Sequence, residues 1–250
     1  PRSTHNQSSA ASDVYKRQDL ARVHYLPMQM RAVFDYLSQG VDVCLLQVAY
    51  DRDGVLRMGP NVDFAAAVLA SSKVVIAELN TALRAPLGCP RIEPEQIDYL
   101  FESDRALTQM AEPKIDAVAQ KIGKLVAELI HDGDCLQTGI GAIPAAILNE
   151  LDTKNDLGLH GGLLDAGGRR LIDAGNVNGS RKAIDTGVHI TGMALGDEAL
   201  FDWLADQASV IFRGADHTHE VSAIAQLHNF VSINSAVEVD LFGQVNAEYA

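Results

Sequence analysis

Short apolar runs rich in β-branched residues alternate with helix-forming segments along most of this chain. Val41–Val48 and Lys73–Leu79 have the composition of buried parallel strands, and Asp63–Ser71 between them is Ala-rich and favours a helix. The alternation returns later, with strands predicted at Cys135–Thr138 and Leu157–His160. Parallel strands need a crossover connection, which a helix usually supplies. The pattern therefore predicts an α/β protein with open, mostly parallel sheets.

The remaining segments complete this expectation. Further strands are expected at Asp98–Phe101, His189–Ala194, Ser209–Phe212 and Phe230–Asn234, and helices at Ala145–Leu151, Gly168–Ala174, Asp197–Leu204 and His217–Leu227. Asp197 and Thr218 are the expected N-caps. The most regular helix is predicted to begin at Glu112–Pro113 and to end near Gly133. Its apolar residues fall at helical spacing: Ile115, Val118, Ala119, Ile122, Leu125, Val126 and Leu129.

Two α/β domains in series account for this order of elements. Residues 19–112 are expected to form the C-terminal part of a first domain, and residues 113–250 the N-terminal part of a second. Residues 1–18 are polar, Ser-rich and without periodicity, so we expect a disordered tail or a stretch foreign to the natural protein. Because the chain stops soon after a predicted strand and turn, we expect both domains to be truncated.

Charge and cysteine content narrow the possible partners. Acidic residues outnumber basic ones, 33 to 20, and the net charge of −13 argues against nucleic acid or an anionic membrane surface. No segment approaches the roughly 20 apolar residues of a membrane span. Cys44, Cys89 and Cys135 are far apart, which is typical of buried thiols in a reducing compartment. We therefore expect a soluble cytoplasmic protein.

Two segments could carry chemistry. Gln137–Pro144 places glycines between a strand and a helix, where backbone N–H groups can approach an anionic ligand. Such a turn can equally serve close packing, and neither the dinucleotide nor the Walker A pattern is complete. The second segment, Ser232–Gln244, interleaves polar and apolar residues. Its polar side chains could gather at one strand end, or could belong to an ordinary strand and turn: Asn234, Ser235, Glu238 and Asp240.

Taken together, these segments resemble a known family. The strings Leu-Gln-Thr-Gly-Ile-Gly-Ala-Ile-Pro (136–144) and Ser-Ile-Asn-Ser-Ala-Val-Glu-Val-Asp-Leu-Phe-Gly-Gln (232–244) are similar to those of the acetyl-CoA hydrolase/transferase family, which includes 4-hydroxybutyrate, propionate and succinate CoA-transferases. The resemblance extends over nearly all of the chain after residue 18. It implies two open α/β domains that face each other across an acyl-CoA cleft.

The resemblance also implies a site and its partners. Five turn residues would line the CoA thioester: Gly139, Ile140, Gly141, Ala142 and Ile143. A glutamate would attack the thioester carbonyl and form an acyl-glutamyl anhydride and then a glutamyl-CoA thioester, while backbone N–H groups stabilise the oxyanion. Acyl-CoA and small carboxylates would be substrates, with no permanently bound cofactor. The full-length protein is expected to form a homo-oligomer.

One departure affects the center of that mechanism. The family's glutamate follows the strand that ends in Leu-Gly-Leu-His, and here that position is Gly162. Three hypotheses remain: another acid such as Asp165 or Glu238 takes over, water replaces the carboxylate and the protein hydrolyses acyl-CoA, or the protein binds CoA esters without turnover as a pseudoenzyme or sensor.

Histidines and basic pairs point to no further site. His217 and His219 at i and i+2 do not share a helix face, and no third ligand is evident, so we expect no metal site. His160 precedes the missing glutamate, and a polar supporting role is expected for it. Arg169–Arg170 and Arg181–Lys182 could meet CoA phosphates, but a solvated helix face is the favoured interpretation.

Overall fold

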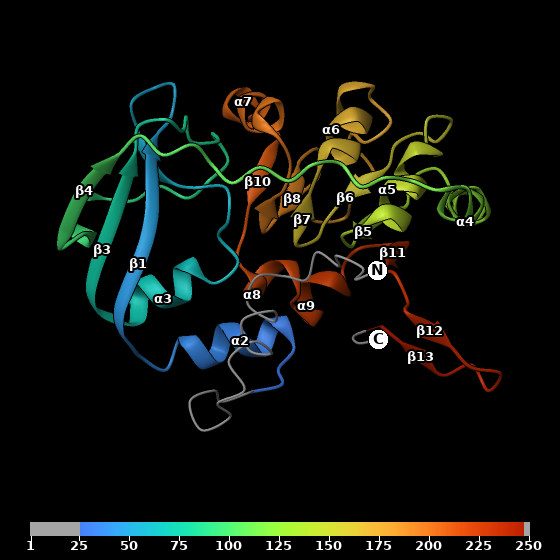
Figure 1. The fold of residues 1–250 in the computed structure, drawn as a ribbon, viewed down its shortest axis with the longest axis horizontal. Coiled ribbons are helices and arrows are strands. Elements are labelled where there is room, and N and C mark those ends of the chain that lie inside the picture. Colours follow the sequence, from blue (N-terminus) through green and yellow to red (C-terminus); the bar gives the residue numbers. More distant parts are fainter. Residues whose placement is uncertain (1–25, 248–250) are drawn as a thin grey trace, which may run out of the picture.

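The computed structural model describes residues 26–247, and the predicted tail at 1–18 lies outside them (Figure 1). Eight α-helices and one short 3-10 helix are described: α2 (Met30–Leu37), α3 (Ala65–Ser71), η2 (Pro94–Gln96), α4 (Ala117–Ala127), α5 (Ala142–Asn149), α6 (Ala166–Asp173), α7 (Glu198–Asp206), α8 (Ala215–Thr218) and α9 (Val221–Ile224). Together with several open sheets they form the expected mixed α/β architecture, and the fold class is confirmed.

The first sheet is built from the N-terminal half of the described chain. Its strands are β1 (Val41–Tyr50), β2 (Leu56–Met58), β3 (Ser72–Asn80) and β4 (Tyr99–Ser103), in the order β2-β1-β3-β4. β1, β3 and β4 run parallel, and β2 pairs antiparallel at one edge. The predicted strands at residues 41–48, 73–79 and 98–101 are confirmed. The first two are rich in β-branched residues, which suit a pleated strand, whereas the third is an exposed strand with aromatic residues.

The strands of the second half form three small parallel sheets. These strands are β5 (Cys135–Thr138), β6 (Gly158–Leu159), β7 (Leu163–Leu164), β8 (His189–Thr191), β9 (Met193–Ala194), β10 (Val210–Phe212) and β11 (Phe230–Ile233). β11, β5 and β6 are parallel neighbours, and β8 pairs parallel with β10. A bridge between His160 and Ile190 joins the two groups. The single strand expected at residues 189–194 is therefore wrong: it is split into β8 and β9, which pair with different partners.

Backbone hydrogen bonds connect the two halves. The amide of Val62 donates to Gly192 O at 2.8 Å, and that of Ala215 donates to Asp63 O at 2.8 Å. One hydrophobic core cluster contains residues from both halves, such as Val48 and Leu136. The division into domains at residue 113 remains a prediction. After β11 the chain continues into the antiparallel hairpin of β12 (Glu238–Val239) and β13 (Val245–Asn246).

The predicted helix at residues 112–133 is too long. The residues around Pro113 have no regular secondary structure, and α4 begins only after Asp116, whose carboxylate accepts a hydrogen bond from Ala119 N at 2.8 Å. Its buried face consists of small residues, because a Cβ on Gly123 would lie 2.8 Å from the backbone of Ala146 in α5. Close approach of α4 to α5 therefore leaves the large apolar residues exposed: Val118, Leu125 and Leu129 are exposed at 66%, 56% and 71%.

The single helix predicted at residues 217–227 is also wrong. The chain forms two short helices, and Thr218 ends α8 instead of capping a helix. Glu220 interrupts them with an extended backbone; its carboxylate accepts from Ser222 N and pairs with Arg31 of α2. By contrast, the expected N-cap Asp197 is confirmed, since it accepts from Leu200 N at 3.0 Å.

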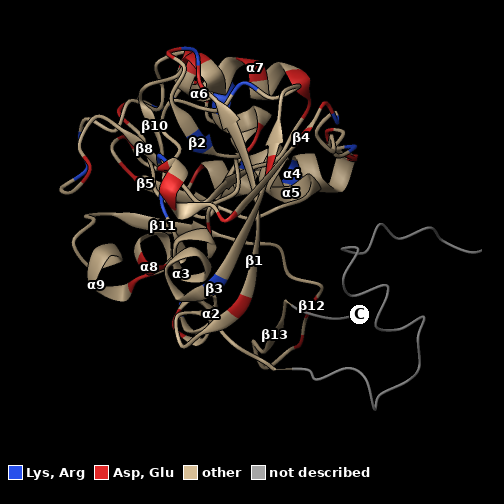
Figure 2. Ribbon diagram, turned by 90° about the vertical axis from the view of Figure 1, so that its left-hand side faces the viewer, with Lys and Arg blue, Asp and Glu red and all other residues tan. Residues whose placement is uncertain are grey.

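The three cysteines are free and buried, as expected. Burial raises the pKa of the Cys135 thiol to about 11. Within residues 26–247, none of the helices combines the length and apolar character needed to cross a bilayer. Figure 2 shows charged residues spread over many elements, with acidic residues prominent on α7.

Candidate active site

Three parallel strands end at the same edge of the β11-β5-β6 sheet. β5 leads into Gly139, β6 leads into His160–Gly161–Gly162, and β11 leads into Asn234. In open α/β sheets, ligands bind outside the carboxyl ends of the strands. This edge is therefore the candidate site, and it gathers the segments that the sequence singled out.

The glycine turn after β5 is accessible. Gly139 N donates to Ile233 O at 2.9 Å, and a Cβ on Gly139 would lie 2.8 Å from Asn234 Oδ1. Ile140 is 54% exposed. Gly141 has a φ of +123° and caps α5, so the free amides of the first helical turn follow directly. The turn thus offers backbone donors to a ligand at the strand ends.

Polar side chains continue this edge toward β11. Ser232 Oγ donates to Gln137 Oε1 at 3.0 Å, and Asn234 Nδ2 donates to Ser232 Oγ at 3.2 Å. Ser232 and Asn234 are exposed, so further hydrogen-bonding capacity faces solvent beside the turn.

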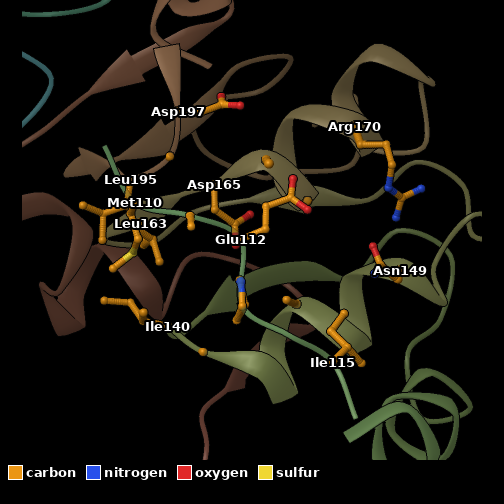
Figure 3. Close-up of a pocket in the computed structure, with 17 residues that line it drawn as sticks. Met110, Glu112, Ile115, Ile140, Asn149, Leu163, Asp165, Arg170, Leu195 and Asp197 are labelled. Atoms are coloured by element: carbon orange, nitrogen blue, oxygen red, sulfur yellow. The ribbon is translucent and has the colours of Figure 1, made fainter. Parts of the chain in front are cut away.

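A cavity of about 250 Å³ lies beside the turn, under the segment that precedes α4 (Figure 3). Ile140 and Gly141 line it together with Asp165, which begins α6. Glu112 and Asp197 add two more carboxylates, and Figure 3 shows Arg170 on its far side. Because three carboxylates repel anions, the phosphates of coenzyme A fit this cavity poorly.

The two carboxylates considered as substitutes for the missing glutamate lie in different places. Asp165 shares the cavity with the glycine turn, but its Oδ1 accepts from Gly168 N at 2.9 Å as the N-cap of α6. Glu238 lies on the exposed β12 and is paired opposite Asn246 in the hairpin. Asp240 on the same hairpin accepts the amides of Phe242 and Gln244. A catalytic role for Asp165 or Glu238 remains a prediction.

An imidazole occupies the space in front of Gly162. A Cβ built on Gly162 would lie 2.8 Å from His219 Cε1 and 3.5 Å from His219 Nε2. His219 is partly exposed, and its Nδ1 lies 2.9 Å from Thr218 Oγ1. Burial lowers the pKa of His219, which favours the neutral ring. Any side chain at position 162 would therefore compete with this ring.

A second group of histidines, His160 and His217, lies near the bend formed by Gly161 and Gly162. His217 Nε2 contacts Asp185 Oδ2 at 2.8 Å, and His160 Nδ1 lies 4.0 Å from the same oxygen. Burial, with the positive charge of Lys182, lowers the pKa of His160 to about 4. Ligand-capable atoms of the three residues lie within 4.8 Å of one another, but the ammonium of Lys182 opposes a further cation. The absence of a metal remains a prediction, whereas the solvated surface expected for Lys182 is wrong because that residue is buried.

A buried carboxyl group lies on the other side of the bend. Asp63 Oδ1 has no hydrogen-bond partner among the residues that the structure describes, and burial raises the pKa of Asp63 to about 6. A Cβ on Gly192 would lie 1.8 Å from this oxygen and 3.3 Å from Gly162 O. Asp63 therefore lies near Gly162 although 99 positions separate them in the sequence.

Known proteins resemble this chain over most of its length. The profile of the acetyl-CoA hydrolase/transferase C-terminal domain matches residues 196–250. The chain is 35% identical over 231 residues to 4-hydroxybutyrate coenzyme A transferase of Clostridium kluyveri, covering 91% of this chain and 54% of that protein. The crystal structure of RipA from Yersinia pestis superposes with a TM-score of 0.89 and 28% identity, over 100% of this chain and 59% of that one. That of 4-hydroxybutyrate CoA-transferase from Porphyromonas gingivalis gives a TM-score of 0.81 and 29% identity, over 93% and 61%.

This chain belongs to the acetyl-CoA hydrolase/transferase family. It spans about half the length of the curated relatives it matches. The resemblance noted from the two sequence strings is thereby confirmed.

Within this acetyl-CoA hydrolase/transferase chain, sequence reasoning found the glycine turn and the loss of the glutamate but missed two groups. His219 and Asp63 reach Gly162 from segments far away in the sequence. The sequence presents His219 only within a His-Thr-His string that could suggest a metal motif, and it presents Asp63 as the start of a predicted helix. Only the loss of a side chain at Gly162, together with a histidine at position 219, could have indicated from the sequence that another group lies at this bend.

Proposed function

We propose that this chain is part of an enzyme that acts on acyl-CoA thioesters and moves coenzyme A between an acyl-CoA and a small carboxylate. The observation that carries this proposal is the exposed glycine turn at the carboxyl ends of β5 and β11, in a chain whose relatives are named as CoA-transferases. Coenzyme A would enter as a substrate, with no permanently bound cofactor.

The turn supplies the binding groups in this proposal. Backbone amides from Ile140 to Ile143, next to Gly139, would face the thioester and stabilise negative charge on its oxygen. Gln137, Ser232 and Asn234 would extend the polar edge along the ligand. The acidic cavity beside Asp165 suits an uncharged part of the ligand better than its phosphates.

Gly162 supports two alternatives to covalent transfer. Glycine cannot form an acyl-glutamyl anhydride, so water could accept the acyl group and the reaction would be hydrolysis. The second alternative is a CoA-ester-binding pseudoenzyme or sensor. The expected setting is a homo-oligomer in the cytoplasm, without nucleic acid or membrane as a partner.

The full-length parent protein provides the test. It would be incubated with acetyl-CoA, butyryl-CoA or succinyl-CoA, with and without acetate, while new acyl-CoA and free CoA are measured by chromatography. The proposal expects exchange or hydrolysis of at least one thioester. Saturable binding in calorimetry without turnover would favour the pseudoenzyme, and neither binding nor turnover would overturn the proposal. Borohydride trapping followed by peptide mass spectrometry would reveal any acylated carboxylate, Asp165 and Glu238 included.

A further inference from the structure

The ring of His219 lies where a side chain at position 162 would begin. The built Cβ of Gly162 comes within 2.8 Å of Cε1, a separation that real Cβ atoms essentially never show. The glutamate expected at this position and the present imidazole position therefore exclude each other. The glycine makes room for a different functional group.

The contacts of the Thr218 hydroxyl are compatible with a basic Nε2 on His219. The hydroxyl oxygen lies 3.3 Å from Gly214 O and 2.9 Å from His219 Nδ1. When the hydroxyl donates to the carbonyl, which can only accept, its oxygen accepts from Nδ1–H. In that tautomer the lone pair of the neutral ring is on Nε2. Burial lowers the pKa of His219 and keeps this lone pair available near neutral pH.

The bend that faces the ring lies next to the glycine turn. β5 and β6 are parallel neighbours, and a Cβ on Gly161 would lie 2.7 Å from Gln137 Cγ. Gln137 precedes Gly139 by two residues in the same strand and turn. A thioester whose oxygen met the turn amides would therefore have its carbonyl carbon near the strand ends that His219 also approaches.

We propose that His219 is the general base of this enzyme and that water is the acyl acceptor. Nε2 takes a proton from water as the water oxygen bonds to the thioester carbonyl carbon. The resulting oxyanion is held by the turn amides, and its collapse breaks the carbon–sulfur bond. The imidazolium returns its proton to the leaving CoA thiolate, so acyl-CoA and water give a carboxylic acid and CoA.

This assignment rests on the acyl-CoA chemistry proposed above and specifies its acceptor. An imidazole in place of a carboxylate removes the group that would hold the acyl chain while CoA departs. Hydrolysis requires a neutral base beside a thioester that water can reach, and His219 would be that base.

The test uses the full-length parent protein with acetyl-CoA and butyryl-CoA, without any carboxylate acceptor. Free CoA thiol is followed for the wild type and for His219→Ala, His219→Gln and His228→Gln. His228 is exposed and serves as the matched histidine control. We expect both His219 variants to lose about 10²- to 10⁴-fold in kcat with little change in KM. Added imidazole should partly restore His219→Ala but not His219→Gln, whose longer side chain fills the space.

The outcomes separate this assignment from the broader proposal. Wild-type turnover that both His219 variants retain would overturn the assignment and leave acyl-CoA chemistry standing. The assignment would also be overturned if the wild type exchanged acyl groups with acetate in a parallel reaction but hydrolysed neither thioester without it. A wild type that neither binds nor turns over either thioester would fail the proposed function itself. Circular dichroism and acetyl-CoA binding of each variant show whether it is folded; a folded His219→Gln suffices if His219→Ala is not.

Discussion

Two neighbouring glycine bends of this molecule lack side chains for different reasons. The bend after β5 contains Gly141, whose φ is +123° and whose built Cβ meets nothing within 4 Å. The bend after the adjacent β6 contains Gly162, whose φ is not in the left-handed region but whose built Cβ meets His219. Conformation requires the first glycine, and a neighbouring side chain requires the second.

This difference explains how one edge of the sheet can keep the family's glycine turn while the position of the family's glutamate changes. The turn at Gly141 depends on backbone geometry alone, so its amides remain available to a ligand. The bend at Gly162 depends on what approaches from α8. A change at residue 219 therefore changes which side chains the bend can hold, while the turn stays as it is.

The largest effect is expected when the family's carboxylate is restored. Gly162→Glu places a carboxylate against the His219 ring and should lower the free energy of unfolding by roughly 3 to 4 kcal/mol, through overpacking and partial burial of charge. Urea unfolding measures the change. The double variant Gly162→Glu/His219→Ala should recover most of the loss. A single variant as stable as the wild type would show that the ring moves aside freely.

A smaller effect on stability, with a definite sign, is expected at Asp63, the buried carboxyl near the Gly162 bend. The pKa of Asp63 is raised from 3.8 to about 6, so the folded state holds the proton more tightly than the unfolded chain. Stability therefore falls as pH rises from about 4 to 6, by roughly 3 kcal/mol in total. Asp63→Asn should be more stable than the wild type at pH 8, and the difference should disappear near pH 4 in thermal unfolding.

Asp51 provides a matched control of opposite sign. Burial raises its pKa, but hydrogen bonds from Arg57 and the amides of Val55 and Asp53 outweigh burial and leave the pKa below its ordinary value. Asp51→Asn should therefore destabilise the protein at neutral pH, with a penalty that shrinks as pH falls through the range where Asp51 is protonated. If both variants shift stability in the same direction at pH 8, hydrogen bonding is not what distinguishes the two carboxyls.

The sequence predicted the strands and the open turn well because both depend on local pattern. The β-branched run at Val41–Val48 carries its own strand preference, and the paired glycines that follow the short segment Cys135–Thr138 indicate a sharp turn between strand and helix. The contact of His219 with the Gly162 bend could not be predicted, because 57 positions separate the two residues and only the tertiary fold brings them together. The start of α4 was misplaced for a similar reason: its contact with α5 uses small residues, which hydrophobic periodicity overlooks.

The comparison of the bends can be tested directly with alanine. Gly141→Ala should cost about 2 kcal/mol, since the positive φ is strained for any residue with a Cβ, and no neighbouring truncation should relieve it. Gly162→Ala should cost about 1 kcal/mol, because the ring can shift by a few tenths of an ångström. A double-mutant cycle with His219→Ala should show coupling for Gly162 and none for Gly141. Equal coupling for both would mean that the two bends are not distinct.

The smallest effect on stability is expected at Gly139. This residue belongs to the turn after β5, but its built Cβ meets a neighbouring side chain, as at Gly162. Its built Cβ would lie 2.8 Å from Asn234 Oδ1, the end of an exposed and flexible side chain that can turn away. Gly139→Ala should therefore cost well under about 1 kcal/mol in urea unfolding, and Asn234→Ala should remove even that cost. The displaced amide would disturb the polar edge at Ser232, so acyl-CoA affinity should fall more than stability. If stability falls by as much as in Gly141→Ala, with no relief from Asn234→Ala, the backbone itself requires Gly139, and the turn is more tightly constrained than its contacts indicate.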